Sequence, residues 1–210
     1  MTVRRRPPQR RSLVTRAALM KAAATEFAQH GYGDGSVNRV LREAGNTKGA
    51  LYFHFPSKLA LAEAVLDEAQ AIYDAIGERW RAERGVGIAP VDAITFMVRD
   101  AAHVYDYDMA VRAEARLTLE PEFADRSPLD TWQSAVADLA RRAAETNCLR
   151  EGFTADKFAR VLTTTLAGQR YMAQVVQIGE PESIKGRYEE SLDVVFAAAG
   201  IERVAPHQCA

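Results

Sequence analysis

The chain has 210 residues, of which 48% are hydrophobic and 26% are charged, so it is long and apolar enough to form a folded core. This composition excludes a disordered chain, a collagen-like repeat and a disulfide-dense scaffold. Its two cysteines, Cys148 and Cys209, cannot build a disulfide framework, and no apolar run reaches the roughly 20 residues of a membrane span. We therefore expect a reduced, cytoplasmic protein without a secretory leader.

The net charge of −1 hides a strong division along the chain. Residues 1–60 contain 11 Lys or Arg against 3 Asp or Glu, a net of +8, whereas the remaining residues carry a net of −9. A basic run is often only a solvated tail. If the basic segment is folded, however, it is suited to bind a polyanion such as nucleic acid.

The basic segment shows the periodicity of three short helices. Apolar side chains recur every three or four residues, which places them on one helical face. Gly31 and Gly45 stop the first two helices. Ser36 is a suitable N-cap for the second helix, and Asn46 and Thr47 are both suitable N-caps for the third. The expected inward residues are Leu13, Ala17, Met20, Ala24 and Phe27 in the first helix, Val37, Val40, Leu41 and Ala44 in the second, and Ala50 and Leu51 in the third, with Phe55 just beyond.

Two short helices joined by a turn at Gly45 have the form of a helix-turn-helix, whose second helix enters the major groove of DNA. In this interpretation residues 48–53 form the groove-reading helix, with Thr47 and Lys48 at its N-terminal tip. Gly49 lets its backbone approach DNA closely. Tyr52, His54 and Lys58 are suited to phosphate oxygens. The candidate DNA-binding residues are Ser36, Asn46, Thr47, Lys48, Gly49, Tyr52, His54 and Lys58.

The run GNTKGALYFHFPSK, from Gly45 to Lys58, together with Gly31-Tyr32, resembles the DNA-binding domain of the TetR family of bacterial transcriptional regulators. Its LYFHF segment also resembles the γ-butyrolactone receptors of actinomycetes. The resemblance covers about the first quarter of the chain and implies an all-α fold, a homodimer and a small-molecule effector. Asn46 departs from the family, which usually has an apolar residue there, so that either its side chain faces solvent or DNA or the turn packs less well.

We divide the chain into a basic arm (1–11), a helix-turn-helix domain (12–56) and an effector-binding and dimerisation domain (57–205). The arm, stiffened by Pro7 and Pro8, either reaches an adjacent minor groove or stays disordered. Apolar spacing predicts one long helix over 57–84 that belongs to both domains and can act as a lever. No strand-like alternation competes with the helical pattern. Further helices are expected at 91–105, 109–119, 129–144, 155–177 and 181–199.

The helix at 155–177 is apolar on two sides, so it needs two packing partners. One is the interior of its own subunit, and the other is either a second subunit or a further part of a monomer. The resemblance favours a homodimer paired through the last two helices, which also suits a palindromic DNA operator. One side of this helix carries Phe158, Val161, Thr165, Gly168 and Met172, and the other carries Leu162, Leu166, Ala173 and Val176. The pattern does not say which of the two sides meets the second subunit. The last helix is expected to complete the interface with Ile184, Tyr188, Leu192, Val195 and Phe196.

Trp132 lies on the apolar stripe of the helix at 129–144, where a tryptophan is usually part of the core. In the γ-butyrolactone receptors a tryptophan at the matching place lines the ligand cavity, so the resemblance makes Trp132 a pocket wall. An apolar cavity with few polar groups suits a small lactone. Thr165 and Gln169 are the expected polar contacts to its carbonyl, and Val161 completes the predicted effector-binding set.

The sequence contains no nucleophile elbow, phosphate-binding loop, HExxH pair or CxxC motif, so we expect neither an enzyme nor a metal or cofactor. His103 and Asp106 supply at most two metal ligands and are interpreted as a helix-end cluster. The predicted function is a regulator that dimerises on a palindromic operator and is released by a small apolar effector. The alternatives are a DNA-binding protein without an effector and an all-α enzyme acting on a lactone.

Overall fold

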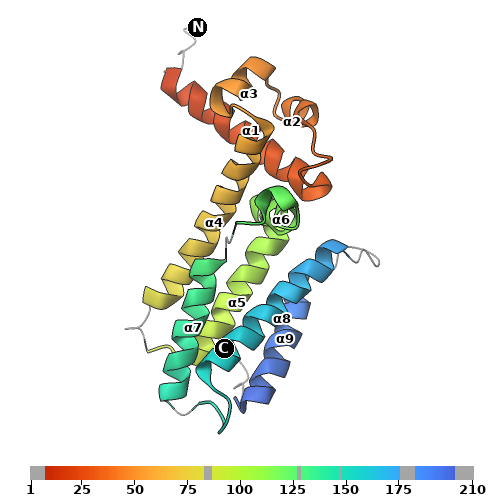
Figure 1. Cartoon of the computed structure of the whole chain (residues 1–210). Coiled ribbons are helices and arrows are strands. Elements are labelled where there is room, and N and C mark those ends of the chain that lie inside the picture. The colour runs from red at the N-terminus through yellow and green to blue at the C-terminus, as the bar shows by residue number, and fades with distance from the viewer. Residues whose placement is uncertain (1–7, 83–86, 127–128, 147, 176–182, 202–210) are drawn as a thin grey trace, which may run out of the picture. The chain divides into compact units, whose positions relative to one another are not determined.

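The computed structural model describes residues 8–82, 87–126, 129–146, 148–175 and 183–201, and within these ranges helices joined by turns form the whole structure. This confirms the expected all-α class. None of the helices in these ranges has the length and apolar character needed to cross a bilayer. Along the chain the elements are α1 (Pro8–His30), α2 (Val37–Glu43), α3 (Lys48–His54), α4 (Lys58–Ala82), α5 (Pro90–Tyr107), α6 (Met109–Leu117), the short 3₁₀ helix η2 (Pro121–Phe123), α7 (Asp130–Glu145), α8 (Ala155–Val175) and α9 (Ile184–Ala199) (Figure 1).

The start of α1 differs from the prediction. The helix begins at Pro8, where a proline is well tolerated because the first helical N–H has no partner within the helix. Leu13 is 66% exposed and Ala17 is also exposed, so the prediction that both face inward was wrong. The buried stripe of α1 begins only at Leu19. The first turns of α1 thus stand clear of the core, and a periodic pattern alone does not reveal where a helix loses its packing partner.

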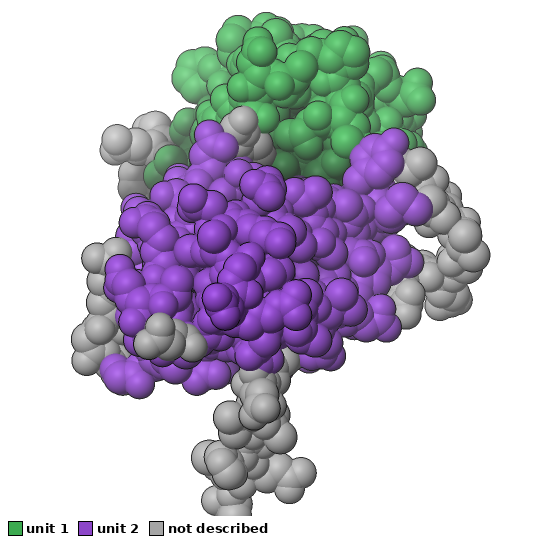
Figure 2. Space-filling model, turned by 60° about the horizontal axis from the view of Figure 1, so that its bottom comes forward, with its two compact units in different colours: residues 1–71, 108–128 green, residues 72–107, 129–210 purple. Residues whose placement is uncertain are grey.

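The chain divides into two compact units, which Figure 2 shows in different colours. Unit 1 comprises residues 1–71 and 108–128, and its α6 packs along α1. Residues 108–128, which the predicted boundaries assign to the second domain, therefore lie with the helix-turn-helix in this division. The side chains that form the centre of unit 1 are fully buried: Leu19, Phe27, Leu51, Leu61 and Leu117.

Unit 2 comprises residues 72–107 and 129–210, and in it α5 packs on α7 and α9 while α8 packs on the same two helices. Its α8 buries Phe158, Leu162 and Leu166 and leaves Met172 44% exposed. The α9 residues expected at the dimer interface are at most 3% exposed within this single chain, so that part of the prediction was wrong: Ile184, Tyr188, Leu192, Val195 and Phe196. They are core residues, because α9 turns this face toward α5 and α8.

Candidate DNA-binding surface and effector pocket

The helix-turn-helix is built by local signals. The Ser36 side chain accepts a hydrogen bond from the N–H of Arg39 at 3.4 Å and caps α2, and the Thr47 side chain accepts one from Ala50 at 3.2 Å and caps α3. Between the two helices Gly45 has a φ of +59°, a conformation that side chains with a Cβ rarely adopt. Leu51 and the other buried residues of α2 and α3 fasten both helices to unit 1. The predicted cap at Ser36 is therefore confirmed, and of the two candidates for α3 the N-cap is Thr47. Both helices lie beside α1 (Figure 1).

Asn46 has a structural role in the turn. Its side-chain amide donates a hydrogen bond to the carbonyl of Ala44 at 2.7 Å, and the residue is half-buried. The side-chain amide thus makes a hydrogen bond within the turn itself. A direct contact of Asn46 with DNA stays a prediction.

The outward face of α3 carries Lys48, Gly49, Tyr52 and Phe53, all of which are exposed. A Cβ added at Gly49 would meet only Thr47 Oγ1, at 4.0 Å, so nothing inside the chain requires a glycine there. Tyr52 is 49% exposed and Phe53 is 79% exposed, whereas Leu51, on the inward side of α3, is fully buried. The helix therefore presents a free surface with one cation, one hydroxyl and one apolar ring.

A buried carboxylate ties α1 to α2. Glu26 is 6% exposed and accepts hydrogen bonds from the Ser36 N–H at 2.7 Å and from Arg39 Nε at 2.8 Å. Burial alone would raise the pKa of Glu26, but the hydrogen bonds and the charge of Arg39 outweigh it and hold the pKa below its usual value of 4.5. Arg39 also donates to the carbonyl of Asp34 at 2.7 Å. This network fixes the residue that caps α2.

Lys58 has partners within unit 1. Its ammonium donates to the carbonyl of Gly33 at 3.2 Å and lies 4.6 Å from the centre of the Tyr32 ring. The Tyr32 ring in turn packs edge to face on Phe123 with centres 5.2 Å apart. Lys58 therefore supports the turn after α1. Its expected phosphate contact stays a prediction, as do those of Tyr52 and His54.

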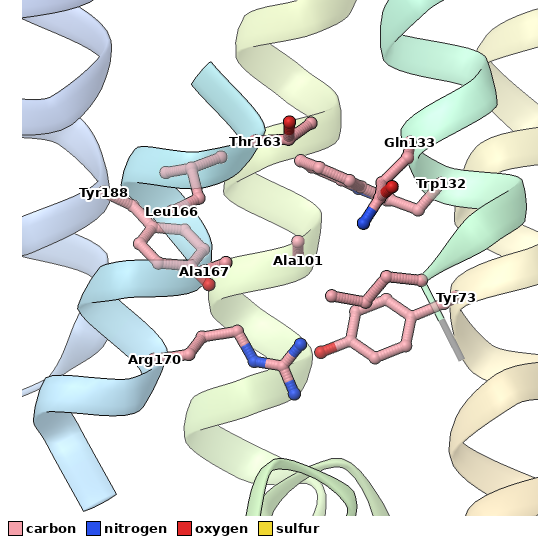
Figure 3. A pocket seen from close by; sticks show the side chains of 10 residues that line it. Tyr73, Ala101, Trp132, Gln133, Thr163, Leu166, Ala167, Arg170 and Tyr188 are labelled. Atoms are coloured by element: carbon pink, nitrogen blue, oxygen red, sulfur yellow. The ribbon is translucent and has the colours of Figure 1, made fainter. Parts of the chain in front are cut away.

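A small cavity lies inside unit 2, between α4, α5, α7, α8 and α9 (Figure 3). Its free volume is about 20 Å³, room for little more than one water molecule. Ligand pockets are typically about 300–1,000 Å³. Any molecule larger than water must therefore displace side chains to enter. The lining residues are Tyr73, Ala101, Leu129, Trp132, Gln133, Thr163, Leu166, Ala167, Arg170 and Tyr188.

The cavity contains two groups that can only donate hydrogen bonds, the Trp132 indole and the Arg170 guanidinium. Trp132 is 4% exposed, and its indole N–H has no hydrogen-bond acceptor among the described residues. Thr163 Oγ1 donates to the carbonyl of Ala159 at 2.8 Å. The Arg170 guanidinium lies 5.5 Å from the centre of the Tyr73 ring, and Figure 3 shows the two side chains extending toward each other. No carboxylate is present among the ten lining residues.

Trp132 lies in the wall of the cavity, as the resemblance implied, but Val161, Thr165 and Gln169 are not among its lining residues. The Thr165 hydroxyl donates to the carbonyl of Val161 at 2.8 Å, on another side of α8. The cavity instead receives Thr163, Leu166, Ala167 and Arg170. These four residues are spaced by three, one and three positions and therefore share one face of α8. Because Arg170 interrupts the apolar character of this face, apolar periodicity alone does not reveal it.

His103 and Asp106 form a cluster at the C-terminal end of α5, as the sequence predicted. Asp106 accepts a hydrogen bond from the N–H of Ile184 at 3.0 Å and another from the Ser183 hydroxyl, and so caps α9. The His103 ring lies 4.8 Å from that of Tyr107. In the part of the chain that the structure describes, no group of three or more His, Cys, Asp or Glu is placed to hold a metal ion.

Comparisons with known proteins decide the family. The model of bacterial regulatory proteins of the tetR family matches residues 19–65, which include all of α2 and α3. A solved structure described as the molecular basis for control of antibiotic production by bacterial hormones is 32% identical, with a TM-score of 0.73 over 92% of this chain and 98% of that one. The chain belongs to the TetR family.

Other TetR-type relatives extend the likeness beyond the DNA-binding unit. The A-factor receptor protein of Streptomyces griseus is 30% identical over 138 residues, which are 65% of this chain and 47% of the receptor, so this chain spans about half the length of that relative. A solved γ-butyrolactone receptor is 22% identical with a TM-score of 0.69, over 90% of this chain and 99% of that one, and it shares the fold.

Proposed function

We propose that this TetR-family chain is a transcriptional regulator that binds a palindromic DNA operator as a homodimer through α3, and that a small apolar effector releases it. The observation that carries the proposal is the exposed outward face of α3, which lies in the basic segment. Lys48, Gly49 and Tyr52 are exposed on this helix, and the buried Leu51 anchors its opposite side. An α-helix of this kind fits the major groove, whose base edges distinguish all four base pairs. Because the partner is chromosomal DNA, we expect the protein in the cytoplasm.

The dimer is proposed to form through α8 and α9. These helices pack on each other within unit 2 and keep large apolar side chains on their outer sides: Tyr171 is 50%, Met172 44% and Val194 69% exposed. Val161 and Thr165 are half-buried and Gly168 is exposed. A two-fold axis at this surface would pair like with like and supply the two reading helices that a palindrome needs.

The effector is proposed to enter the cavity beside Trp132. The buried indole N–H without an acceptor favours a ligand that brings a carbonyl or other acceptor oxygen, because an unpaired buried donor costs about 1–3 kcal/mol. Ala101, Leu129 and Leu166 favour an apolar remainder. A lactone or related acyl compound with an alkyl chain has both features, and γ-butyrolactones are the ligand class named for one structural neighbour.

Release is proposed to follow from the expansion of the cavity. With only about 20 Å³ free, an effector must move lining residues, and two of these lie close to places where the chain passes between the units. Tyr73 follows the border at residue 71 within α4, and Leu129 follows the border at residue 128. Such coupling is typically ~1–3 kcal/mol and is reciprocal, so operator DNA must weaken effector binding by the same factor.

The test uses full-length protein and a duplex recovered by in vitro selection from genomic fragments. We expect salt-dependent binding of the duplex, release by an acyl lactone, and quenching of tryptophan fluorescence that Trp132→Phe abolishes and Trp80→Phe preserves. Failure to enrich any duplex would refute the DNA-binding function. Normal DNA binding that no lactone or acyl compound weakens would refute the effector.

The small volume of the cavity favours one alternative, a TetR-family DNA-binding protein that responds to no small molecule. In that case Trp132 is a core residue and its fluorescence responds to no member of a small-molecule panel. Trp132→Phe would then leave DNA binding unchanged under every condition, whereas the effector proposal requires it to impair release.

A further inference from the structure

We propose that Phe53 packs against the methyl group of a thymine in the major groove and thereby contributes to the base preference of this protein. The inference rests on the proposed function, because it concerns the helix that this function places in the groove. Phe53 was not among the DNA-binding residues expected from the sequence.

The exposure of Phe53 alone does not require an explanation, since single apolar side chains are common on protein surfaces. Its position does. At 79% it is the most exposed of the large apolar side chains in the described part of the chain, yet it belongs to the segment 1–60, which carries a net positive charge. An apolar ring on a surface built for an anion needs a specific apolar partner on that anion.

Helix geometry places Phe53 on the outward face of α3. Successive residues of an α-helix are separated by about 100°, so Phe53 lies about 200° from the buried Leu51 and points away from the core. Gly49 lies four residues earlier on the same face, and helical side chains lean toward the N-terminus, over the preceding turn. The Phe53 ring is therefore directed over the open surface beside Gly49. The ring of His54 packs edge to face with it, and the two ring centres are 5.1 Å apart.

The chemistry of the side chain selects the partner. Phenylalanine has no hydrogen-bond donor or acceptor in its side chain, so it can bind neither a phosphate oxygen nor the polar atoms of a base edge. The apolar group that DNA displays in the major groove is the 5-methyl group of thymine. The neighbouring Tyr52 and Lys48 retain the polar contacts, which leaves the methyl group to Phe53.

The experiment removes that methyl group and nothing else. In the selected duplex, each thymine is replaced in turn by deoxyuridine, and affinity for the full-length protein is measured by fluorescence anisotropy. Burial of one methyl group is worth ~0.8 kcal/mol, so we expect about a fourfold loss at one thymine of each half-site. Phe53→Ala and Phe53→Asn are expected to bind the unmodified duplex more weakly and to lose this penalty. Tyr52→Phe should keep it.

The possible results separate this inference from the function on which it rests. If the duplex is bound but the deoxyuridine penalty persists unchanged in Phe53→Ala or Phe53→Asn, or if no thymine shows a penalty, the role of Phe53 is refuted and the DNA-binding function stands. If selection enriches no duplex, both are refuted. Circular dichroism checks that each variant is folded, which the exposure of Phe53 leads us to expect.

Discussion

The Glu120 carboxylate accepts a hydrogen bond from the backbone N–H of Gly33 at 2.9 Å and a second one from the N–H of Tyr32. Residues far apart in the chain are thus joined within unit 1, at the turn between α1 and α2. A Cβ added at Gly31 would clash with the same carboxylate, and Gly31 has a φ of +72°. The turn that precedes the helix-turn-helix is therefore held by a side chain from the segment after α6.

Glu120→Ala should destabilise unit 1 by about 1–2 kcal/mol, because two backbone N–H groups lose a charged acceptor. Urea unfolding followed by circular dichroism measures the loss. Glu122→Ala is the matched control, since it removes the same charge from an exposed side chain two residues away. Equal stability of the two variants would show that the hydrogen bonds between Glu120 and the turn contribute nothing to the free energy of unfolding.

The buried Glu26 predicts an acid-sensitive component of stability. Because its pKa is lower in the folded protein than the usual 4.5, its contribution is fully present above pH 4.5 and is lost as the pH falls through the folded value. We expect the unfolding free energy of the natural chain to decrease as the pH is lowered below 4.5. Glu26→Gln should start lower and show a shallower fall, whereas Glu43→Gln, at an exposed position, should follow the natural curve.

Lys48 and Lys58 are expected to differ in their effect on DNA binding. Lys48→Ala should relax preference at one base pair by about 1–3 kcal/mol, because this side chain is exposed at the tip of the reading helix. Lys58→Ala should weaken binding to all sequences alike and reduce the salt slope by about one. It should also lower stability, since it removes the contacts with Gly33 and Tyr32. Uniform losses for both variants would contradict these roles.

Gly49→Ala should separate stability from DNA binding. The site has open space and lies in a helix, where alanine is favoured over glycine by about 0.5–1 kcal/mol, so the variant should be at least as stable as the natural chain. Its affinity for DNA should fall, because the added methyl group separates the helix backbone from the groove. Thermal unfolding and anisotropy on the same samples provide both values. Unchanged affinity would mean that the backbone does not approach DNA at this residue.

The proposed dimer surface predicts that Val194→Glu produces monomers. Val194 is 69% exposed in the single chain, so a charge there costs little unless a second subunit covers it. Val14→Glu introduces the same change at an exposed valine of unit 1 and should leave the dimer intact. Sedimentation velocity distinguishes the two species. A dimer that tolerates Val194→Glu would place the interface elsewhere.

Local signals predicted the secondary structure well. The spacing of buried residues such as Leu66 and Ala69, and the helix caps at Ser36 and Thr47, act within a few residues and are legible in the chain. The errors arose where tertiary packing decides. Leu13 continues the apolar stripe of α1 but is 66% exposed and has no packing partner in unit 1.

The cavity was predicted less well for the same physical reason. The position of Trp132 in the cavity wall was predicted from the resemblance. To predict that Thr163 and not Thr165 lines the cavity, one must know how α8 is rotated about its axis. Periodicity gives this rotation only when the inward face is uniformly apolar. Arg170, 8% exposed, breaks that uniformity. Cys209, Val176 and residues 1–7 of the predicted basic arm lie outside the described residues.

The assignment of residues 108–128 to unit 1 has a consequence for how the protein is made. A ribosome that has synthesised only α1 to α4 has produced the whole helix-turn-helix motif but not the helix that covers α1, nor Glu120 and Phe123, which hold Tyr32. A nascent chain or a truncated gene product ending near residue 71 would expose the apolar side of α1. Unit 1 is complete only after residue 128 has left the exit tunnel, so a product that ends near residue 71 lacks part of the core on which the helix-turn-helix rests.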